Sequence, residues 1–258
     1  MALYVNESGP ATAPTTVFLH GGGISGWMWQ PQVEQLSDYH CLIPDLPEHG
    51  RSVDEKPYAM KDTVARVMEL IRARAHGGHA HVVGLSLGGQ TAAALLATAP
   101  EVIDHAVLSG TLVRPLPGVS LVNASVKMYM PFKDIDFLIR ANLQSQGIPK
   151  QYFPQFKEDT RVLTADGMAR VFTENMRFSL PTGLSKATVP TLVLIGQKEY
   201  GVMRQSARDL VRALPNAKGF IAPRVGHAWN LQAPDLFTRT VRAWITDQPL
   251  PQELLPLQ

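Results

Sequence analysis

Short apolar runs alternate with helix-like segments along most of the chain. The apolar runs have the length and the β-branched content of buried strands and cover residues 15–20, 40–44, 80–85, 105–110, 190–196 and 217–222. The segments between them repeat apolar residues at helical spacing and cover residues 61–75, 87–99, 202–213 and 234–246. This alternation predicts an α/β fold, in which helices cover both faces of a mainly parallel sheet.

One long gap interrupts the alternation. About 80 residues separate the strands near residues 107 and 193, whereas a crossover between parallel strands needs only about a dozen. Three helix-like segments lie in the gap, at residues 120–130, 134–146 and 166–178. We therefore predict that residues 113–187 form an inserted helical cap on a core made of residues 1–112 and 188–258.

Composition limits the class of protein. With 258 residues and 45% hydrophobic content, the chain can bury the core of one domain with an insertion. The formal net charge is only +2, which gives no electrostatic reason to expect a nucleic acid or a membrane surface as partner. The N-terminal segment lacks the pattern of a signal peptide, and no window approaches the roughly 20 apolar residues of a membrane span, so we expect a cytoplasmic protein.

Two smaller features complete this picture. Cys41 is the single cysteine, so an intrachain disulfide is excluded, and its apolar neighbourhood predicts a buried, inert thiol. The Pro-rich segment 247–258 is expected to leave the fold as irregular chain. The oligomeric state does not follow from any of these features.

A serine flanked by glycines marks the first candidate site. The sequence GLSLG at residues 84–88 joins the strand signal to the helix signal and places Ser86 at the turn. A sharp strand-to-helix turn needs neighbours without Cβ atoms and exposes the serine Oγ at a helix N-terminus, as in a nucleophile elbow. The alternative is a serine that caps the helix.

A second glycine motif follows the first predicted strand of the core. The sequence HGGG at residues 20–23 lies where a loop reaches the same edge of the sheet as Ser86. Backbone N–H groups in such a loop can approach a carbonyl oxygen closely. We predict an oxyanion hole formed by the N–H groups of Gly22 and Leu87, with Gly23 as a substitute for Gly22. The alternative is a glycine turn that only ends a strand.

These motifs together resemble the α/β-hydrolase family over nearly the whole chain. The resemblance rests on HGGGISGWMW after the family's third strand, DLPEHGRS after its fourth and GLSLGG after its fifth. It implies an eight-stranded sheet, a cap inserted after the sixth strand, and a nucleophile, an acid and a histidine in that order along the chain.

The resemblance also assigns the partners of Ser86. RVGHAWNLQAPDLF is similar to the family's histidine loop and makes His227 the base, whereas the other seven histidines are expected to be structural or solvated. The family usually carries aspartate after the strand that TLVLIG forms here, and this chain has Glu199 in that place. Glutamate can orient an imidazole if its loop is set back by about one methylene. The alternative is a solvated surface glutamate.

A serine nucleophile with a histidine base predicts acyl transfer to water, and therefore a serine carboxylesterase. Relatives that open epoxides or displace halide use aspartate at the elbow. No metal is expected, because the chain lacks metal-ligand spacing, and no organic cofactor is required. The alternatives are a lactonase, a C–C hydrolase, a perhydrolase or a hydroxynitrile lyase with the same triad, and a ligand receptor that turns over slowly.

The substrate is the least determined part of the prediction. Apolar side chains are frequent in the insertion and after HGGG, and we predict that Gly23, Trp27, Met128 and Trp229 contact the substrate. No cluster of Arg and Lys suggests a phosphate or coenzyme A group. We therefore expect a small, uncharged and partly apolar carboxylic ester.

Overall fold

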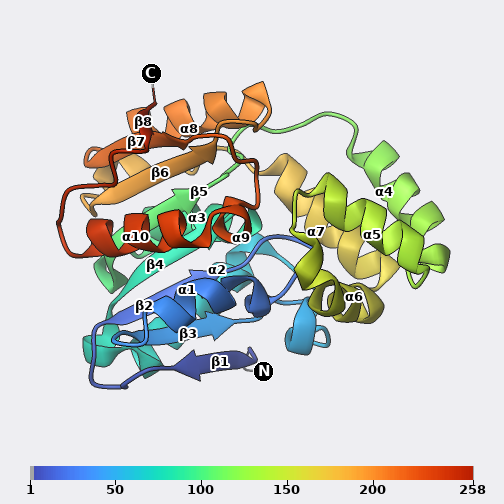
Figure 1. The fold of residues 1–258 in the computed structure, drawn as a ribbon, viewed down its shortest axis with the longest axis horizontal. Helices are drawn as coiled ribbons and strands as arrows, with labels where there is room; N and C mark the ends of the chain where they lie inside the picture. Colours follow the sequence, from blue (N-terminus) through green and yellow to red (C-terminus); the bar gives the residue numbers. More distant parts are fainter. Residues whose placement is uncertain (1–2, 258) are drawn as a thin grey trace.

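The computed structural model describes residues 3–257, which contain one sheet of eight strands (Figure 1). The strands are β1 (Val5–Ser8), β2 (Thr15–Leu19), β3 (His40–Pro44), β4 (Ala80–Leu85), β5 (Ile103–Ser109), β6 (Thr191–Gly196), β7 (Ala217–Ala222) and β8 (Leu255–Pro256). Their order is β1-β3-β2-β4-β5-β6-β7-β8. The edge strands β1 and β8 run antiparallel to their neighbours, and all other neighbours are parallel. The predicted eight-stranded, mainly parallel α/β fold is confirmed.

The positions of the motifs relative to the strands differ from the prediction. The HGGG loop follows β2, DLPEHGRS follows β3 and GLSLGG follows β4, so each lies one strand earlier than the resemblance implied. The insertion likewise follows the fifth strand and not the sixth. The count still reaches eight because the C-terminal segment, expected to be irregular, pairs Leu255 and Pro256 with the open edge of β7.

Helices cover both faces of the sheet, as predicted. Those of the core are α1 (Gln30–Gln35), α2 (Met60–Arg74), α3 (Leu87–Thr98), α8 (Gly201–Ala213), α9 (Trp229–Gln232) and α10 (Pro234–Ile245). Buried residues of α2, α3 and α8 pack in one apolar cluster, and those of α10 pack in another. Successive residues of β2 alternate between the two clusters: Val17 and Leu19 join the first and Phe18 the second. The side chains of the central strands are therefore buried on both faces.

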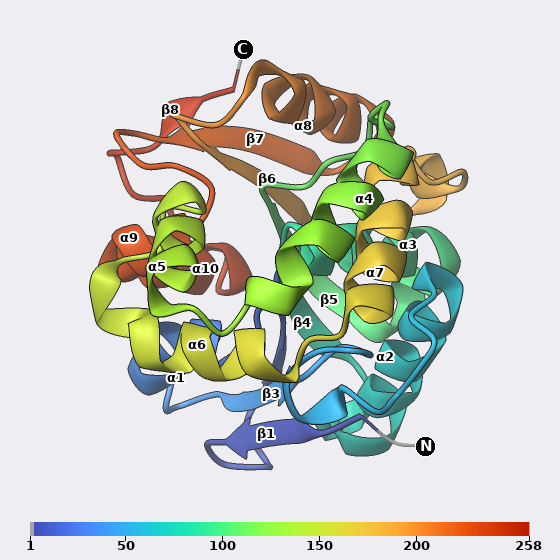
Figure 2. The same ribbon diagram turned by 90° about the vertical axis from the view of Figure 1, so that its right-hand side faces the viewer.

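Four helices connect β5 to β6 and lie beyond one end of the strands (Figure 1). They are α4 (Val119–Tyr129), α5 (Asp136–Ser145), α6 (Phe153–Val162) and α7 (Ala165–Arg177), and we call them the cap. All four fall inside the predicted insertion 113–187. Figure 2, turned by 90° about the vertical axis, shows them in front of the sheet. Three were predicted; α6 was missed, although Pro154 in its first turn is a common helix-start signal.

The remaining sequence-level expectations concern single residues and the membrane. Cys41 is buried, so that part of the prediction is confirmed, and burial raises the pKa of its thiol to about 12. None of the helices within residues 3–257 combines the length and the apolar character needed to cross a membrane.

Candidate active site

Ser86 lies at a strained turn between β4 and α3. Its backbone has φ +57° and ψ −114°, a conformation that residues with a Cβ atom seldom adopt. Such strain costs on the order of 1–3 kcal/mol and persists only where the surroundings hold it. Here the Ser86 N–H donates to the Ser109 carbonyl of β5, and the Gln90 N–H donates to the Ser86 carbonyl, each at 2.9 Å.

The Ser86 hydroxyl does not cap the helix. Ser86 occupies the N-cap position of α3, yet its side chain accepts no capping hydrogen bond from that helix. The side chain is partly exposed, whereas its neighbours on both sides are buried. The capping alternative is therefore excluded, and the hydroxyl is available at the N-terminal end of a twelve-residue helix.

Two glycines allow α3 to lie directly on the sheet backbone. A Cβ atom on Gly84 would stand 2.3 Å from the Gly88 carbonyl oxygen, and one on Gly88 would stand 2.0 Å from the Leu19 carbonyl oxygen. Both distances are far shorter than a van der Waals contact. The motif needs glycine at these two positions because the turn brings helix and strand backbones together.

Glu199 and His227 form a hydrogen-bonded pair. The His227 Nδ1 lies 2.7 Å from Glu199 Oε2, and the Gly196 N–H donates to Glu199 Oε1 at 2.9 Å. The Glu199 side chain is 2% exposed, whereas that of His227 is 38% exposed. Each carboxylate oxygen thus has its own donor, so the carboxylate is fixed and the imidazole remains accessible. Glu199 is buried, and the alternative of a solvated surface glutamate is excluded.

The two halves of the site meet at Ser109 and Gly110. Ser109 accepts the hydrogen bond from Ser86, and Gly110, with φ +54°, packs against the histidine. A Cβ atom on Gly110 would lie 2.7 Å from Cε1 and 2.8 Å from Nδ1 of His227. Ser86 and His227 therefore contact adjacent residues at the carboxyl end of β5. Sequence reasoning did not single out Gly110, whose only signal was its place at the end of a strand.

The HGGG loop lies against the Ser86 turn. A Cβ atom on Gly21 would be 3.6 Å from the Ser86 Cβ, and one on Gly22 would be 3.8 Å from Leu87 Cδ2. Leu87 is the first residue of α3, where backbone N–H groups have no partner within the helix. Gly22 and Leu87, the predicted oxyanion-hole residues, are therefore neighbours.

His20 anchors the start of this loop. It is fully buried, its Nε2 accepts the Leu46 N–H at 2.8 Å, and its Nδ1 lies 2.8 Å from the Gly21 carbonyl oxygen. Burial lowers the pKa of His20 to about 4, so the ring is neutral at physiological pH. His20 has the structural role that the sequence analysis expected.

A cavity of about 460 Å³ separates the HGGG loop from the cap. Its lining residues are Gly22, Gly23, Ser125, Val126, Tyr129, Met130, Leu138, Ala141, Asn142, Ser145, Gln146, Thr160, Leu163, Met168 and Phe172. All of these side chains are uncharged. The volume is that of a small-molecule site, and the lining suits a mostly apolar ligand with a few hydrogen-bonding groups.

Of the four predicted substrate contacts, only Gly23 lines this cavity. Trp27, Met128 and Trp229 are not among its lining residues. Trp229 is fully buried, and its indole N–H donates to Ser109 Oγ at 2.8 Å. Met128 is 72% exposed on the cap, and its neighbours Tyr129 and Met130 face the cavity instead. The Trp27 indole N–H donates a hydrogen bond to the carboxylate of Asp159 in the cap.

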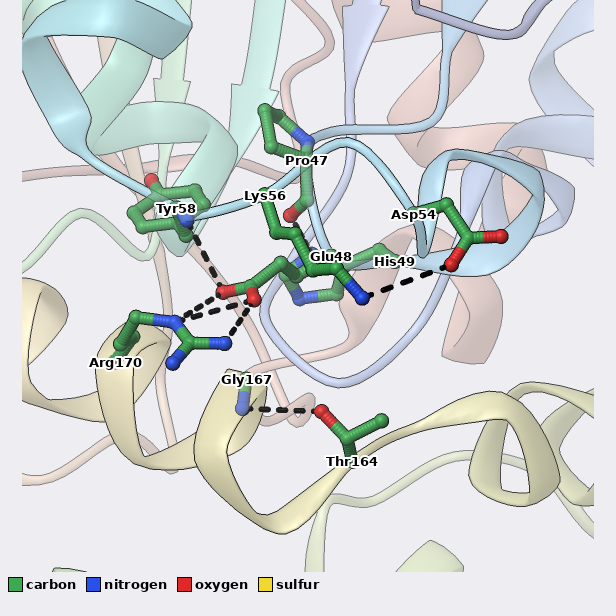
Figure 3. A network of polar contacts seen from close by, with 9 residues as sticks. All are labelled: Pro47, Glu48, His49, Asp54, Lys56, Tyr58, Thr164, Gly167 and Arg170. Atoms are coloured by element: carbon green, nitrogen blue, oxygen red, sulfur yellow. Dashed lines mark hydrogen bonds and ion pairs between the residues drawn. The ribbon is translucent and has the colours of Figure 1, made fainter.

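Charged and polar pairs attach the cap to the core. Figure 3 shows Glu48, from the loop after β3, between the Arg170 guanidinium of α7 and the Tyr58 N–H, which donates to Glu48 Oε2 at 3.1 Å. The Arg170 Nε donates to both Glu48 oxygens at 3.0 and 3.1 Å. The Glu48 side chain is almost fully buried. No local signal pairs residues 122 positions apart, so this attachment was not predicted.

The contact of Gly110 with His227 generates a prediction. Gly110→Ala should push the imidazole away from Glu199, whereas Gly118→Ala, at another positive φ but with nothing within 4 Å of its Cβ, should only strain the backbone. The measurement is the downfield proton resonance of the His227 Nδ1–H in wild type and both variants. We expect it to disappear in Gly110→Ala and to persist in Gly118→Ala; its survival in Gly110→Ala would show that the contact does not constrain the ring.

Comparison with known proteins identifies the family of this chain. The chain matches the model of the alpha/beta hydrolase family over residues 16–240. An AB hydrolase superfamily protein of Gibberella zeae is 29% identical over 259 residues, covering 93% of this chain and 83% of that protein. A candidate carbamate hydrolase of Pseudomonas syringae pv. syringae is 28% identical over 251 residues, covering 93% of this chain and 96% of that protein. The solved structure of an esterase from Exiguobacterium antarcticum aligns with a TM-score of 0.80 at 19% identity over 95% of each chain. Because the family match spans most of the sequence, the chain belongs to the alpha/beta hydrolase family.

Proposed function

We propose that this hydrolase is a serine carboxylesterase that cleaves uncharged, partly apolar carboxylic esters through an acyl-enzyme. The observation that carries the proposal is the convergence of the strained Ser86 turn and the His227–Glu199 pair on Ser109 and Gly110. A serine hydroxyl needs a base to become a nucleophile, and a base needs an oriented imidazole.

The chemistry follows from these groups. His227 Nε2 takes the Ser86 proton while Oγ attacks the ester carbonyl carbon, and the carbonyl oxygen becomes an oxyanion that the N–H groups of Gly22 and Leu87 stabilise. The intermediate collapses by breaking the bond to the alcohol oxygen, which receives the proton from His227. Water then attacks the acyl-enzyme in the same way and releases the acid and free Ser86.

Glu199 keeps His227 in the productive tautomer. With Oε2 accepting from Nδ1–H, the lone pair stays on Nε2, which can then take the proton of the nucleophile, and the carboxylate stabilises the imidazolium that forms. The Gly196 N–H holds the second oxygen of Glu199 and so helps to fix the carboxylate against the imidazole.

The lining of the cavity supports the proposed substrate class. A charged substrate would lose its hydration there without meeting an opposite charge, because every lining side chain is uncharged. The Pseudomonas relative's name points to a carbamate, whose carbonyl is attacked in the same way, and lactones are cyclic esters. A carbamate and a lactone are therefore included with simple esters in the substrate panel that tests the proposed function.

The function is tested with a substrate panel on wild type and Ser86→Ala. A neutral p-nitrophenyl ester should turn over repeatedly, and an anionic half-ester of matched length should have kcat/KM lower by about 10²-fold or more, because its carboxylate would be buried unpaired. Ser86→Ala should lose at least about 10³-fold in kcat while keeping its circular dichroism. Release of one equivalent of p-nitrophenol without turnover would indicate a receptor, and preference for the lactone or carbamate would reassign the substrate.

The acid is tested separately with two substitutions. In Glu199→Gln only one oxygen remains for two donors, so an amide NH2 faces either His227 or Gly196, and kcat should fall by between about 10² and 10⁴-fold. Glu199→Asp retains the charge but shortens the reach, so kcat should fall less and KM should change little. The measurement is kcat for one activated ester from pH 5 to 9. Wild-type kcat for Glu199→Gln at every pH would remove Glu199 from the mechanism.

A further inference from the structure

A buried carboxylate of the cap holds the segment that directly follows HGGG. Asp159 of α6 is 6% exposed and accepts three hydrogen bonds across a sequence separation of more than 130 residues. Its Oδ2 accepts from the Ser25 N–H at 2.6 Å and from the Trp27 indole N–H at 2.5 Å, and its Oδ1 accepts from the Ser25 hydroxyl at 2.8 Å. No other cap side chain has this many hydrogen bonds to the loop among the described residues.

The same segment is held from the core side. Between Ser25 and Trp27, the Gly26 N–H donates to Asp45 Oδ1 at 2.8 Å. The Trp27 ring also stacks on Tyr152, which ends the short 3-10 helix Lys150–Tyr152 just before α6, with centroids 5.7 Å apart. Residues 25–27 are thus clamped between one carboxylate of the core and one of the cap.

The clamp lies next to the predicted oxyanion donors. Gly22 and Gly23 stand three and two residues before Ser25, and they line the cavity together with Thr160, the neighbour of Asp159. Glycines give this part of the loop little conformational restraint of its own. Its position must therefore be imposed by the residues that flank it, which are His20 on one side and the clamp on the other.

We propose that Asp159 is a positioning residue: through Ser25 and Trp27 it holds the HGGG loop so that the N–H of Gly22 points at the oxyanion. The inference rests on the proposed ester hydrolysis. It means that the cap does more than enclose the substrate, because oxyanion stabilisation requires α6 to be seated on the loop.

The hydrogen bonds tolerate a change of charge on Asp159. All three donors are uncharged groups, and burial raises the pKa of the carboxyl to about 6, with nearby Asp45 acting in the same direction. Protonation at Oδ1 would only reverse the bond with the Ser25 hydroxyl, which can donate or accept, while Oδ2 keeps both N–H groups. Asparagine can make the same three bonds, whereas leucine of similar size can make none.

The test compares Asp159→Leu with Asp159→Asn. Glu158→Gln on the same helix is the control, because the Glu158 side chain is exposed and forms an ion pair with Arg161 of the same helix. A loop displaced by about 1 Å costs on the order of 10²-fold in rate, so Asp159→Leu should lose about that factor in kcat with little change in KM for the neutral ester. The affinity of a trifluoromethyl ketone, which forms a tetrahedral adduct, should fall in parallel. Asp159→Asn should recover most of both losses, and Glu158→Gln should match wild type.

Hydrogen exchange of the Ser25 amide provides a readout that does not depend on activity. Its protection should be lost in Asp159→Leu and kept in Asp159→Asn. If Asp159→Leu does not fold, Trp27→Phe is the deciding variant, because it removes the indole N–H that donates to Asp159 but keeps an aromatic ring against Tyr152. This variant should lower kcat and inhibitor affinity together. Wild-type kcat and inhibitor affinity in folded Asp159→Leu, or in Trp27→Phe where that variant decides, would overturn the inference. Failure of wild type to hydrolyse any ester would instead refute the proposed function, whatever the exchange data show.

Discussion

Direct contact between the backbone of α3 and the strands β2 and β4 is the constraint on which the site depends. Gly84 and Gly88 leave no room for a Cβ atom, so the helix begins as close to the sheet as two backbones allow. This closeness accompanies the strained conformation of the Ser86 turn, and Ser86 directly precedes the first N–H groups of α3, which have no partner within the helix. The backbone strain at Ser86 and the position of its hydroxyl at the start of α3 therefore both depend on the close contact between helix and sheet.

The parallel sheet brings the remaining groups to this turn. Strands β2, β4, β5 and β6 all end at the edge that the cap covers, and each is followed by one part of the site: HGGG, Ser86, Gly110 and Glu199. Helix N-termini and loops at this edge are the usual place for ligands in α/β proteins. The cap adds a neutral cavity and, through Glu48–Arg170 and Asp159, two buried attachments that fix where it sits.

Local patterns in the sequence were sufficient for most of the core. The six central strands and four core helices were predicted within two residues at each end, since their signals are apolar runs and helical spacing. Ser86, His227 and Glu199 could be chosen as candidates because each follows such a run or lies in a recognisable motif. The weak edge strands β1 and β8 are stabilised by pairing with a neighbour and have no local signal. Trp27, Met128 and Trp229 do not line the cavity, because composition cannot tell a packed aromatic or an exposed methionine from a cavity wall. Asp159 was not singled out because its role depends on a contact with residues far away in the chain.

Covalent labelling of Ser86 tests the central claim most directly. A p-nitrophenyl alkylphosphonate, which mimics the tetrahedral intermediate but cannot be hydrolysed readily, would be incubated with wild type and with His227→Ala, and the digested protein would be analysed by mass spectrometry. The account predicts one phosphonyl group per chain, located on the peptide that contains Ser86, with release of one equivalent of p-nitrophenol and much slower labelling in His227→Ala. Labelling of another residue, or ester hydrolysis that persists while Ser86 remains unmodified, would contradict it.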